Sequence, residues 1–238
     1  MIKINKFKTE FYLDGADISD FKKFKENKLI KGFTTNPSLM RKAGVKNYEE
    51  FCKKSLKIIK KKPISFEIFA DDIAEIRYQA KLISKWGKNI FVKIPIVNTK
   101  NISNAKLIGE LNREGVKLNV TAVFTLSQTK KILKEIGKKT PIIISVFAGR
   151  LADAGVDPKV EISKHVKISK NYKNAKILWA SVRQSFNIIE AEKTKCHIIT
   201  IPPNILNKVK TFNKDLNQFS IETVKMFYID AKKSKYKL

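Results

Sequence analysis

The chain of 238 residues is short of cysteine and histidine, and each shortage excludes a class of site. Cys52 and Cys196 lie far apart without metal-ligand spacing, which excludes a disulfide framework and a cysteine zinc site. His165 and His197 are the only histidines, so a histidine-rich metal site is also excluded. We therefore expect no metal, and the low cysteine content favours a reducing, cytoplasmic setting.

Long apolar runs are missing too. No stretch approaches the ~20 apolar residues that span a bilayer. The N-terminal sequence MIKINKFKTEFYLDG carries a charge every few residues and lacks the apolar segment of a signal peptide. The sequence thus predicts a soluble, cytoplasmic protein with no membrane partner.

Acidic residues and arginines are scarce, whereas lysines are abundant. The chain has 49 Lys+Arg against 22 Asp+Glu, a net charge of +27, yet only five arginines. Such an excess predicts a polyanion partner, but lysine substitutes poorly for arginine in bidentate recognition of phosphates or bases. Because the lysines are spread over every predicted helix, we expect no nucleic-acid partner and keep polyanion binding as a distant alternative.

Short apolar runs recur along the whole sequence. Most of them are rich in Ile, Val and Phe and nearly continuous in apolar character, as strands covered on both faces should be. We therefore predict eight strands, within residues 11–16, 31–36, 64–70, 90–96, 117–124, 141–148, 176–182 and 197–203.

Segments with helical periodicity separate several of these runs. An apolar stripe with lysines opposite predicts helices within 48–61, 72–85, 102–114 and 127–138. Alternating strands and helices, in a length close to the ~250 residues typical of the fold, favour an α/β (β/α)8 TIM barrel. The predicted organisation is one domain over 1–238 with an additional C-terminal helix over about 217–235. An open doubly wound sheet is the alternative, although no GxGxxG or GxxxxGK[ST] loop follows a strand.

Polar residues gather inside or just after the predicted strands. Chemistry in a TIM barrel collects at the carboxyl ends of its strands, so these residues form the candidate site. The eighth strand offers little. The candidates are Asp14, Thr34, Thr35, Asn36, Glu67, Lys93, Asn119, Thr121, Ser145, Arg150, Ser181 and Arg183.

Lys93 is the sharpest candidate, because it interrupts the apolar run IFVKIPI. Lysine is depleted in strands and in protein interiors. Burial disfavours an ammonium ion, and the resulting free amine can attack a carbonyl carbon. A solvent-facing lysine on an edge strand is the alternative. Glu67, in the preceding strand, is a second charge in an apolar run and predicts either a catalytic couple or a structural ion pair.

Two of the five arginines, Arg150 and Arg183, follow the sixth and seventh strands. The guanidinium group matches a phosphate dianion, and TIM barrels often hold phosphate near their last loops. Trp179 in the seventh strand is expected to fill the barrel interior, with a place in the pocket wall as the alternative. The aromatic residues of the C-terminal helix predict docking on the barrel or on a neighbouring subunit, so a homo-oligomer is left open.

The sequence resembles the transaldolase/fructose-6-phosphate aldolase family over nearly its whole length. The blocks occur in the family's order, and TTNPSL together with the lysine of VKIP is specific to it. The blocks are FYLDGAD (11–17), GFTTNPSLM (32–40), SFEIF (65–69), FVKIPI (91–96), LNVTAVFT (118–125), SVFAGR (145–150), ILWASVRQ (177–184) and TIPPNIL (200–206).

The resemblance implies a class I aldolase-type barrel with Lys93 as the Schiff-base lysine and no cofactor. Asp14 matches the acid that handles protons during carbon–carbon cleavage, and Glu67 and Thr121 match the pair that holds a catalytic water. Residues matching the positions that bind the sugar or its phosphate are Thr35, Asn36, Asn119, Ser145, Phe147, Arg150, Ser181 and Arg183.

Family members divide at two positions. Aldolases tend to have Gln where Glu67 stands and Tyr where Phe147 stands, so both residues favour a transaldolase. The resemblance implies transfer of a dihydroxyacetone unit from a ketose phosphate, such as fructose 6-phosphate or sedoheptulose 7-phosphate, to an aldose phosphate in the pentose phosphate pathway. The alternatives are an aldolase that releases dihydroxyacetone and a relative acting on another sugar in a specialised biosynthetic pathway.

Overall fold

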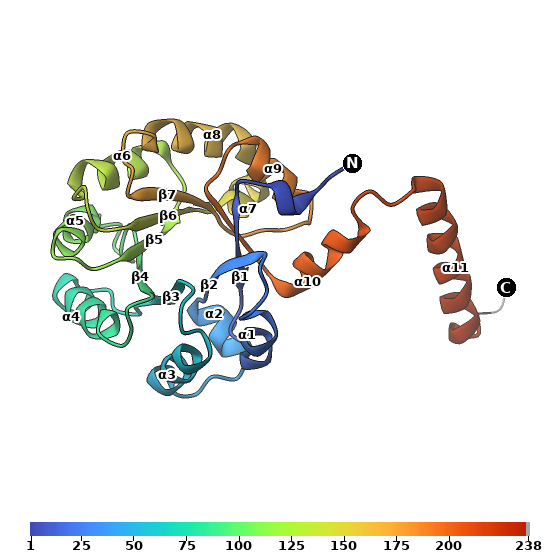
Figure 1. Ribbon diagram of the computed structural model, residues 1–238, viewed down its shortest axis with the longest axis horizontal. Coiled ribbons are helices and arrows are strands. Elements are labelled where there is room, and N and C mark those ends of the chain that lie inside the picture. The colour runs from blue at the N-terminus through green and yellow to red at the C-terminus, as the bar shows by residue number, and fades with distance from the viewer. Residues whose placement is uncertain (237–238) are drawn as a thin grey trace.

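Eight parallel strands close into a barrel in which each strand pairs with its neighbours in chain order (Figure 1). The computed structural model describes residues 1–236, so the last two residues of the predicted domain range 1–238 lie outside it. The TIM barrel is confirmed, and the open doubly wound sheet is wrong because β1 also pairs with β8. The strands are β1 (Glu10–Asp14), β2 (Ile30–Thr34), β3 (Ile64–Glu67), β4 (Ile90–Pro95), β5 (Leu118–Val123), β6 (Ile142–Val146), β7 (Ala175–Trp179) and β8 (Ile198–Ile201).

Helices surround the barrel, and many of them have an N-cap residue with a short polar side chain. Asp17, Asn36, Asn47, Asp72 and Thr125 each accept a hydrogen bond from a backbone N–H of the first turn. The helices are α1 (Ile18–Phe24), α2 (Pro37–Lys42), α3 (Tyr48–Ile58), α4 (Ile73–Ser84), α5 (Ala105–Arg113), α6 (Leu126–Glu135), α7 (Ala148–Asp153), α8 (Pro158–Ser169), α9 (Asn187–Lys193), α10 (Pro203–Leu206) and α11 (Leu216–Ser234), with 3-10 turns η1 (Ile4–Lys6) and η2 (Asn207–Thr211).

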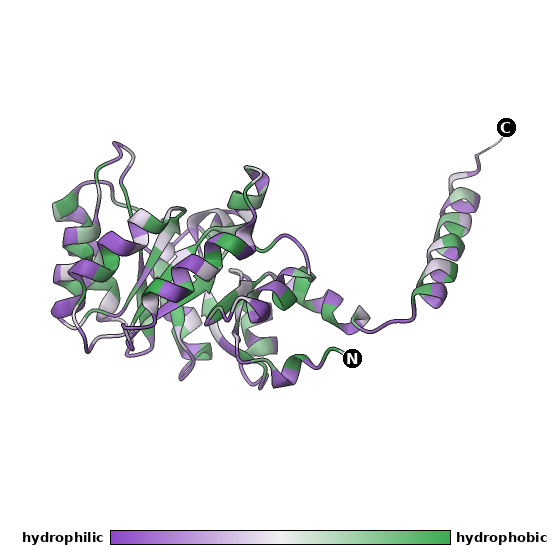
Figure 2. Cartoon of the chain, turned by 90° about the horizontal axis from the view of Figure 1, so that it is seen from above, coloured by the Kyte–Doolittle hydropathy of each residue, from purple (hydrophilic) through white to green (hydrophobic). Residues whose placement is uncertain are grey.

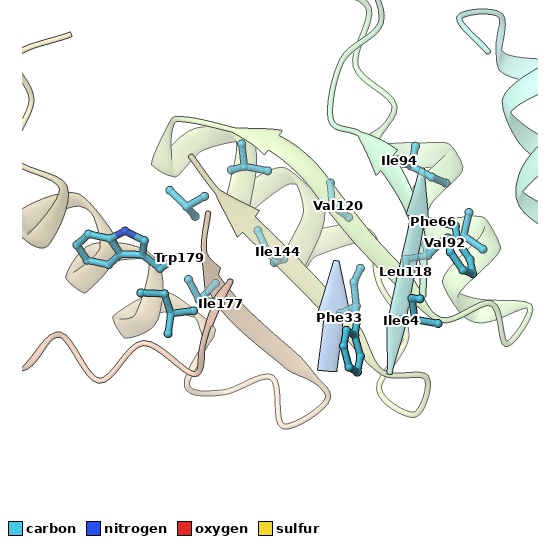
Figure 3. Packing of buried hydrophobic residues seen from close by; sticks show 14 of the residues in the cluster. Phe33, Ile64, Phe66, Val92, Ile94, Leu118, Val120, Ile144, Ile177 and Trp179 are labelled. Carbon is cyan, nitrogen blue, oxygen red and sulfur yellow. The ribbon is translucent and has the colours of Figure 1, made fainter. Parts of the chain in front are cut away.

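The main apolar core lies between the strands and the helices. One set of alternate strand residues, including Phe33, Ile64, Val92 and Ile144, packs outward into this layer (Figure 3). A smaller cluster inside the barrel holds Tyr12, Phe91, Ile143, Leu178, Ala180 and Ile198. The remaining inward positions are free to carry polar groups.

One sequence expectation is wrong, and one helix is shorter than its predicted range. Trp179 was expected inside the barrel, but it belongs to the outer core, because β7 turns Leu178 and Ala180 inward instead. The helix predicted within 102–114 begins only at Ala105, and Ile102 lies in the preceding loop, 48% exposed. An isolated bridge between Val97 and Ser103 orders that loop.

The C-terminal helix is confirmed as α11, and it stands clear of the barrel beyond α10 and η2 (Figures 1 and 2). None of its residues is buried. Within residues 1–236, no helix combines the length and apolar character required to cross a bilayer.

Candidate active site

Three polar residues form a row across adjacent strands inside the barrel. Glu67 at the end of β3 is in register with Lys93 on β4, and Lys93 is in register with Asn119 on β5. Parallel pairing places all three on the same face, since side chains at matching register point the same way. This row is therefore assembled by the pairing of β3, β4 and β5 and not by any loop.

Lys93 is buried, with 6% of the residue exposed. Its Nζ lies 3.0 Å from Oε2 of Glu67 and donates a hydrogen bond to the backbone carbonyl of Thr35 at 3.2 Å. The alternative of a solvent-facing edge lysine is wrong, because β4 is paired on both sides, with β3 and β5. The amine is thus held between two strands in a fixed direction.

Asp14, at the end of β1, is the second carboxyl group of the interior. Its Oδ1 accepts a hydrogen bond from Oγ1 of Thr34 at 2.7 Å, and Thr34 is hydrogen-bonded in turn to Oγ1 of Thr200 on β8. Burial raises the pKa of Asp14 above its usual range, against the lowering effects of the Lys93 ammonium and the Thr34 hydroxyl. A carboxyl whose pKa is raised can both accept and donate a proton closer to neutral pH.

Thr200 is a residue that the sequence did not single out. It is buried on β8, in register with Tyr12 of β1. Threonine is a common strand former, so a threonine inside an apolar run carries no signal of its own. Only the closure of β8 against β1 brings it next to Thr34.

A chain of amide and hydroxyl groups continues the site from β3 to β6. Asn119 donates from Nδ2 to Oγ of Ser65 at 3.0 Å and accepts at Oδ1 from Oγ of Ser145 at 2.6 Å. Oγ1 of Thr121 is buried and has no hydrogen-bond partner among the described residues. These contacts fix Asn119 and leave the Thr121 hydroxyl available to a bound molecule.

Thr35 and Asn36 follow β2 and occupy different positions. Thr35 is fully buried, and its hydroxyl donates to the carbonyl of Ser65 at 2.9 Å. The backbone carbonyl of Thr35 accepts the hydrogen bond from Lys93. Oδ1 of Asn36 caps α2 by accepting from the N–H of Leu39 at 2.9 Å. The Asn36 cap keeps that side chain at the end of the strand, half-buried beside the site.

The two arginines follow β6 and β7, Arg150 on α7 and Arg183 in the loop after β7. Arg183 forms an ion pair with Asp153 at the end of α7, and both side chains are about half exposed. Arg150 is exposed on α7. Ser181, after β7, has a positive φ of 63°, and the N–H of Gly149 on α7 donates to the carbonyl of Ala180 at 3.4 Å. A Cβ added to Gly149 would lie 1.7 Å from the Ser181 carbonyl oxygen, so only glycine permits this close contact of the two loops.

Phe147 follows β6 directly, as the residue before α7. It is partly buried against the cluster inside the barrel, and its ring centroid is 5.7 Å from that of Phe124.

Taken together, the residues place a buried primary amine beside one carboxylate, with a second carboxyl group and several hydroxyl and amide groups in the same interior. This arrangement suits nucleophilic attack on a carbonyl followed by proton transfers. In the part of the chain that the structure describes, no three His, Cys, Asp or Glu side chains gather as metal ligands.

Residues 11–238 match the sequence profile of a family described as Transaldolase/Fructose-6-phosphate aldolase. A probable transaldolase 2 from Listeria monocytogenes is 33% identical over 222 residues, covering 89% of this chain and 97% of the relative. A probable transaldolase from Methanococcus vannielii is 34% identical over 214 residues, covering 90% of this chain and 94% of the relative.

Solved structures of other enzymes share the barrel. A putative phosphonomutase from Burkholderia cenocepacia superposes with a TM-score of 0.58 at 10% identity, covering 90% of this chain and 96% of that one. Thiamine phosphate pyrophosphorylase from Pyrococcus furiosus gives a TM-score of 0.56 at 12% identity, covering 82% and 86%. At such identities the likeness establishes the fold alone.

Proposed function

Because the chain belongs to the transaldolase/fructose-6-phosphate aldolase family, we propose that it is a transaldolase that forms a Schiff base through Lys93. It takes a dihydroxyacetone unit from a ketose phosphate, such as fructose 6-phosphate or sedoheptulose 7-phosphate, and transfers it to an aldose phosphate. The observation that carries this proposal is the buried Lys93 amine, 3.0 Å from the Glu67 carboxylate. The relatives named above are described as probable transaldolases.

The first steps are the attack on the ketone and the loss of water. Glu67 takes a proton from the Lys93 ammonium, and the free amine adds to the carbonyl carbon to give a carbinolamine. Glu67 then returns the proton to the departing hydroxyl, which leaves as water, and an iminium ion remains on Lys93. The direct contact of the two side chains makes Glu67 the nearest group for both transfers.

Cleavage requires a base at the hydroxyl group beyond the bond that breaks. Asp14 removes that proton, the carbon–carbon bond breaks, and its electrons move into the iminium to give an enamine. An aldehyde phosphate leaves. The enamine then adds to the acceptor aldehyde, Asp14 returns the proton, and water releases the new ketose. The raised pKa of Asp14 suits a group that both accepts and donates.

Recognition of the sugar is assigned to the polar groups around this centre. Asn36, Asn119 and Ser145 face the carbon chain with amide and hydroxyl groups, and Thr121 together with Glu67 holds a catalytic water. Arg150, Arg183 and Ser181 receive the phosphate, since guanidinium groups bind phosphate oxygens in pairs.

The test combines trapping with product identification. The protein is incubated with fructose 6-phosphate, reduced with borohydride and digested. We expect an adduct of three or six carbons on Lys93 and none in a Lys93→Ala variant. Full activity of Lys93→Ala would overturn the proposal, and no adduct from any phosphorylated ketose in a panel would do the same.

Transfer is separated from simple cleavage in the same assay. With erythrose 4-phosphate present, a transaldolase makes sedoheptulose 7-phosphate and releases almost no dihydroxyacetone. Release of dihydroxyacetone at the same rate with and without the acceptor identifies the aldolase alternative. Glu67 and Phe147, the residues that transaldolases carry at these two positions, favour transfer.

A further inference from the structure

Three adjoining hollows cross the amino-terminal end of the barrel, opposite the candidate active site. Glu10 opens β1, Lys31 is the second residue of β2, and Pro63 directly precedes β3, so all three residues lie at that end. The first and second hollows share Glu10 and Lys31 in their linings, and the second and third share Pro63 and Phe91. Their volumes are about 510, 490 and 610 Å³. Because neighbouring hollows share walls, they form one continuous depression, which we call the basal groove.

Lysines line the basal groove along its whole length. Glu10 is the one acidic residue in its lining. Within residues 1–236, Glu10 pairs with Lys176 at 2.5 Å, and none of the other lysines of the groove has a carboxylate partner. A groove lined by charges of one sign concentrates their field and attracts ions of the opposite sign. Its nine lysines are Lys8, Lys28, Lys31, Lys60, Lys61, Lys88, Lys117, Lys173 and Lys176.

The stability of the helices explains only part of this accumulation of lysine. The helices of the barrel end on the same side as the groove, and a cation near a helix carboxyl terminus stabilises the helix. That accounts for Lys60 and Lys61, which follow α3. By contrast, Lys31 belongs to β2, Lys117 directly precedes β5, and Lys8 lies ahead of β1. The groove therefore carries more positive charge than the helices require.

The lining of the groove selects the kind of anion that fits it. None of the five arginines lies in the lining, so the bidentate recognition of bases is missing. Single-stranded nucleic acids also bind by stacking on aromatic rings, yet the aromatic residues of the lining are partly or fully buried. Lysine is a compact point charge that attracts phosphate without a fixed orientation. The chemistry thus suits repeated phosphate charges without bases. The aromatic residues are Phe7, Phe11, Tyr12, Trp86 and Phe91.

The floor of the basal groove is closed. Tyr12, Phe91 and Ile143 line its middle hollow, and all three belong to the apolar cluster inside the barrel. Tyr12 is only 3% exposed and Ile143 only 2%. An anion can therefore lie across this end of the barrel, but it cannot pass through the interior to Lys93.

We propose that the basal groove binds inorganic polyphosphate, a flexible chain of phosphate units. The continuity of the three hollows favours a chain over a single anion, and the lysines along them lie beside its successive charges. The lack of arginine and of exposed aromatic rings favours polyphosphate over a nucleic acid. This inference is independent of the proposed function, because the groove and Lys93 lie at opposite ends of the barrel.

The first test measures the binding of end-labelled polyphosphate to the full chain by fluorescence anisotropy. We expect saturable binding in about 50 mM salt, with an affinity that falls as the salt concentration rises. A triple variant, Lys31→Gln with Lys61→Gln and Lys173→Gln, removes at least one charge from each hollow. The slope of log affinity against log salt should become shallower by about 2, at about 0.7 for each lost phosphate contact.

The matched control is the triple variant Lys42→Gln, Lys106→Gln and Lys159→Gln. It changes three exposed lysines outside the groove and has the same net charge as the first variant, so it should bind as the wild type does. Equal losses in the two triple variants overturn the proposal, as does a wild type that does not bind. Tighter binding of a uridine oligonucleotide with the same number of phosphates also overturns it and assigns the groove to nucleic acid.

The second test locates the contact without any variant. The full chain is acetylated with and without polyphosphate, and the modified lysines are identified by mass spectrometry. We expect polyphosphate to protect Lys31, Lys61 and Lys173 and to leave the reactivity of Lys42 and Lys106 unchanged. Saturating fructose 6-phosphate should not remove the protection, because the groove is separate from the candidate active site. Protection spread evenly over the lysines, or its loss with fructose 6-phosphate, overturns the proposal.

Discussion

The amine nitrogen of Lys93 lies 3.0 Å from the carboxylate of Glu67, and the two residues face each other at the same register of adjacent strands. The contact belongs to the barrel itself, since β3 and β4 hold the two side chains together through backbone pairing. It follows that a substitution can abolish proton transfer between the two groups while both side chains keep their positions.

Replacing Glu67 by glutamine tests whether the Glu67 carboxylate takes the proton of Lys93. Glu67→Gln keeps the shape and an acceptor oxygen but cannot take a proton from Lys93. We expect the rate of borohydride-trappable adduct formation to fall by roughly 10²- to 10⁴-fold, the range for a positioned acid–base group. Glu49→Gln, on the surface of α3, serves as the control and should leave the rate unchanged. An unaltered rate in Glu67→Gln would mean that this carboxylate moves no proton.

Burial raises the pKa of Asp14, and the hydrogen bond from the Thr34 hydroxyl lowers it in part; Thr200 is hydrogen-bonded to Thr34. The Thr34 hydroxyl donates to the carboxylate and favours its charged form, so Thr34→Val raises the pKa of Asp14 further. Whichever limb of the pH profile of kcat/KM depends on Asp14 should move to higher pH. Thr200→Val, which acts through Thr34, should move it less. Thr34→Ser retains the hydroxyl and should restore the wild-type pH profile. Profiles that coincide for the wild type, Thr34→Val and Thr200→Val would refute the effect of these hydroxyls on Asp14.

Arg183 is expected to recognise the phosphate group. With Arg183→Met, the KM for fructose 6-phosphate should rise about tenfold to a hundredfold, the value of a charge-assisted hydrogen bond. Neither kcat nor the turnover of unphosphorylated fructose should change much. Arg113→Met is the matched control, because that guanidinium bonds the Glu135 carbonyl outside the site. Equal losses with the phosphorylated and unphosphorylated sugars would place Arg183 elsewhere in the reaction.

His165 should make the protein sensitive to acid. It is fully buried, with Nδ1 hydrogen-bonded to the hydroxyl of Thr129 at 2.7 Å, and burial lowers its pKa from 6.5 to about 4. Between those values the unfolded chain binds the proton and the folded chain does not. The free energy of unfolding therefore falls as pH falls, by about 2 kcal/mol between pH 7 and pH 5.

The measurement is urea unfolding of the wild type and of His165→Gln at both pH values. The variant lacks the titrating group, so its loss of stability between pH 7 and pH 5 should be smaller by about that amount. Losses of the same size in both proteins would contradict the assignment to His165.

The strands were predictable because barrel strands are covered on both faces. The run IFVKIPI and the strand β4 (Ile90–Pro95) agree to within one residue. It was harder to predict which of two neighbouring strand residues points into the barrel. Whether Trp179 or Leu178 points inward depends on the register of β7 in the closed barrel, and no local pattern distinguishes two neighbouring apolar residues.

The site was predictable where polar residues interrupted apolar runs, as Lys93 and Glu67 do. Contacts between distant elements were not. The Thr34–Thr200 hydrogen bond joins residues 166 positions apart, and the ion pair of Arg183 with Asp153 joins the loop after β7 to the end of α7. The sequence gives no sign of either contact, because the first depends on the closure of the barrel and the second on the path of the chain after β7.

The alternation of inward and outward residues has a consequence for how this protein can change. Neighbouring residues of one strand point to different sides: Val92 and Ile94 pack in the outer core, whereas Lys93 between them lies inside the barrel beside Glu67. The inward positions can thus be exchanged as a set for another substrate while the outward ones stay fixed. A library confined to inward positions such as Asn119, Thr121 and Ser145 should yield mostly folded proteins with altered chemistry, which makes this barrel a practical scaffold for directed evolution.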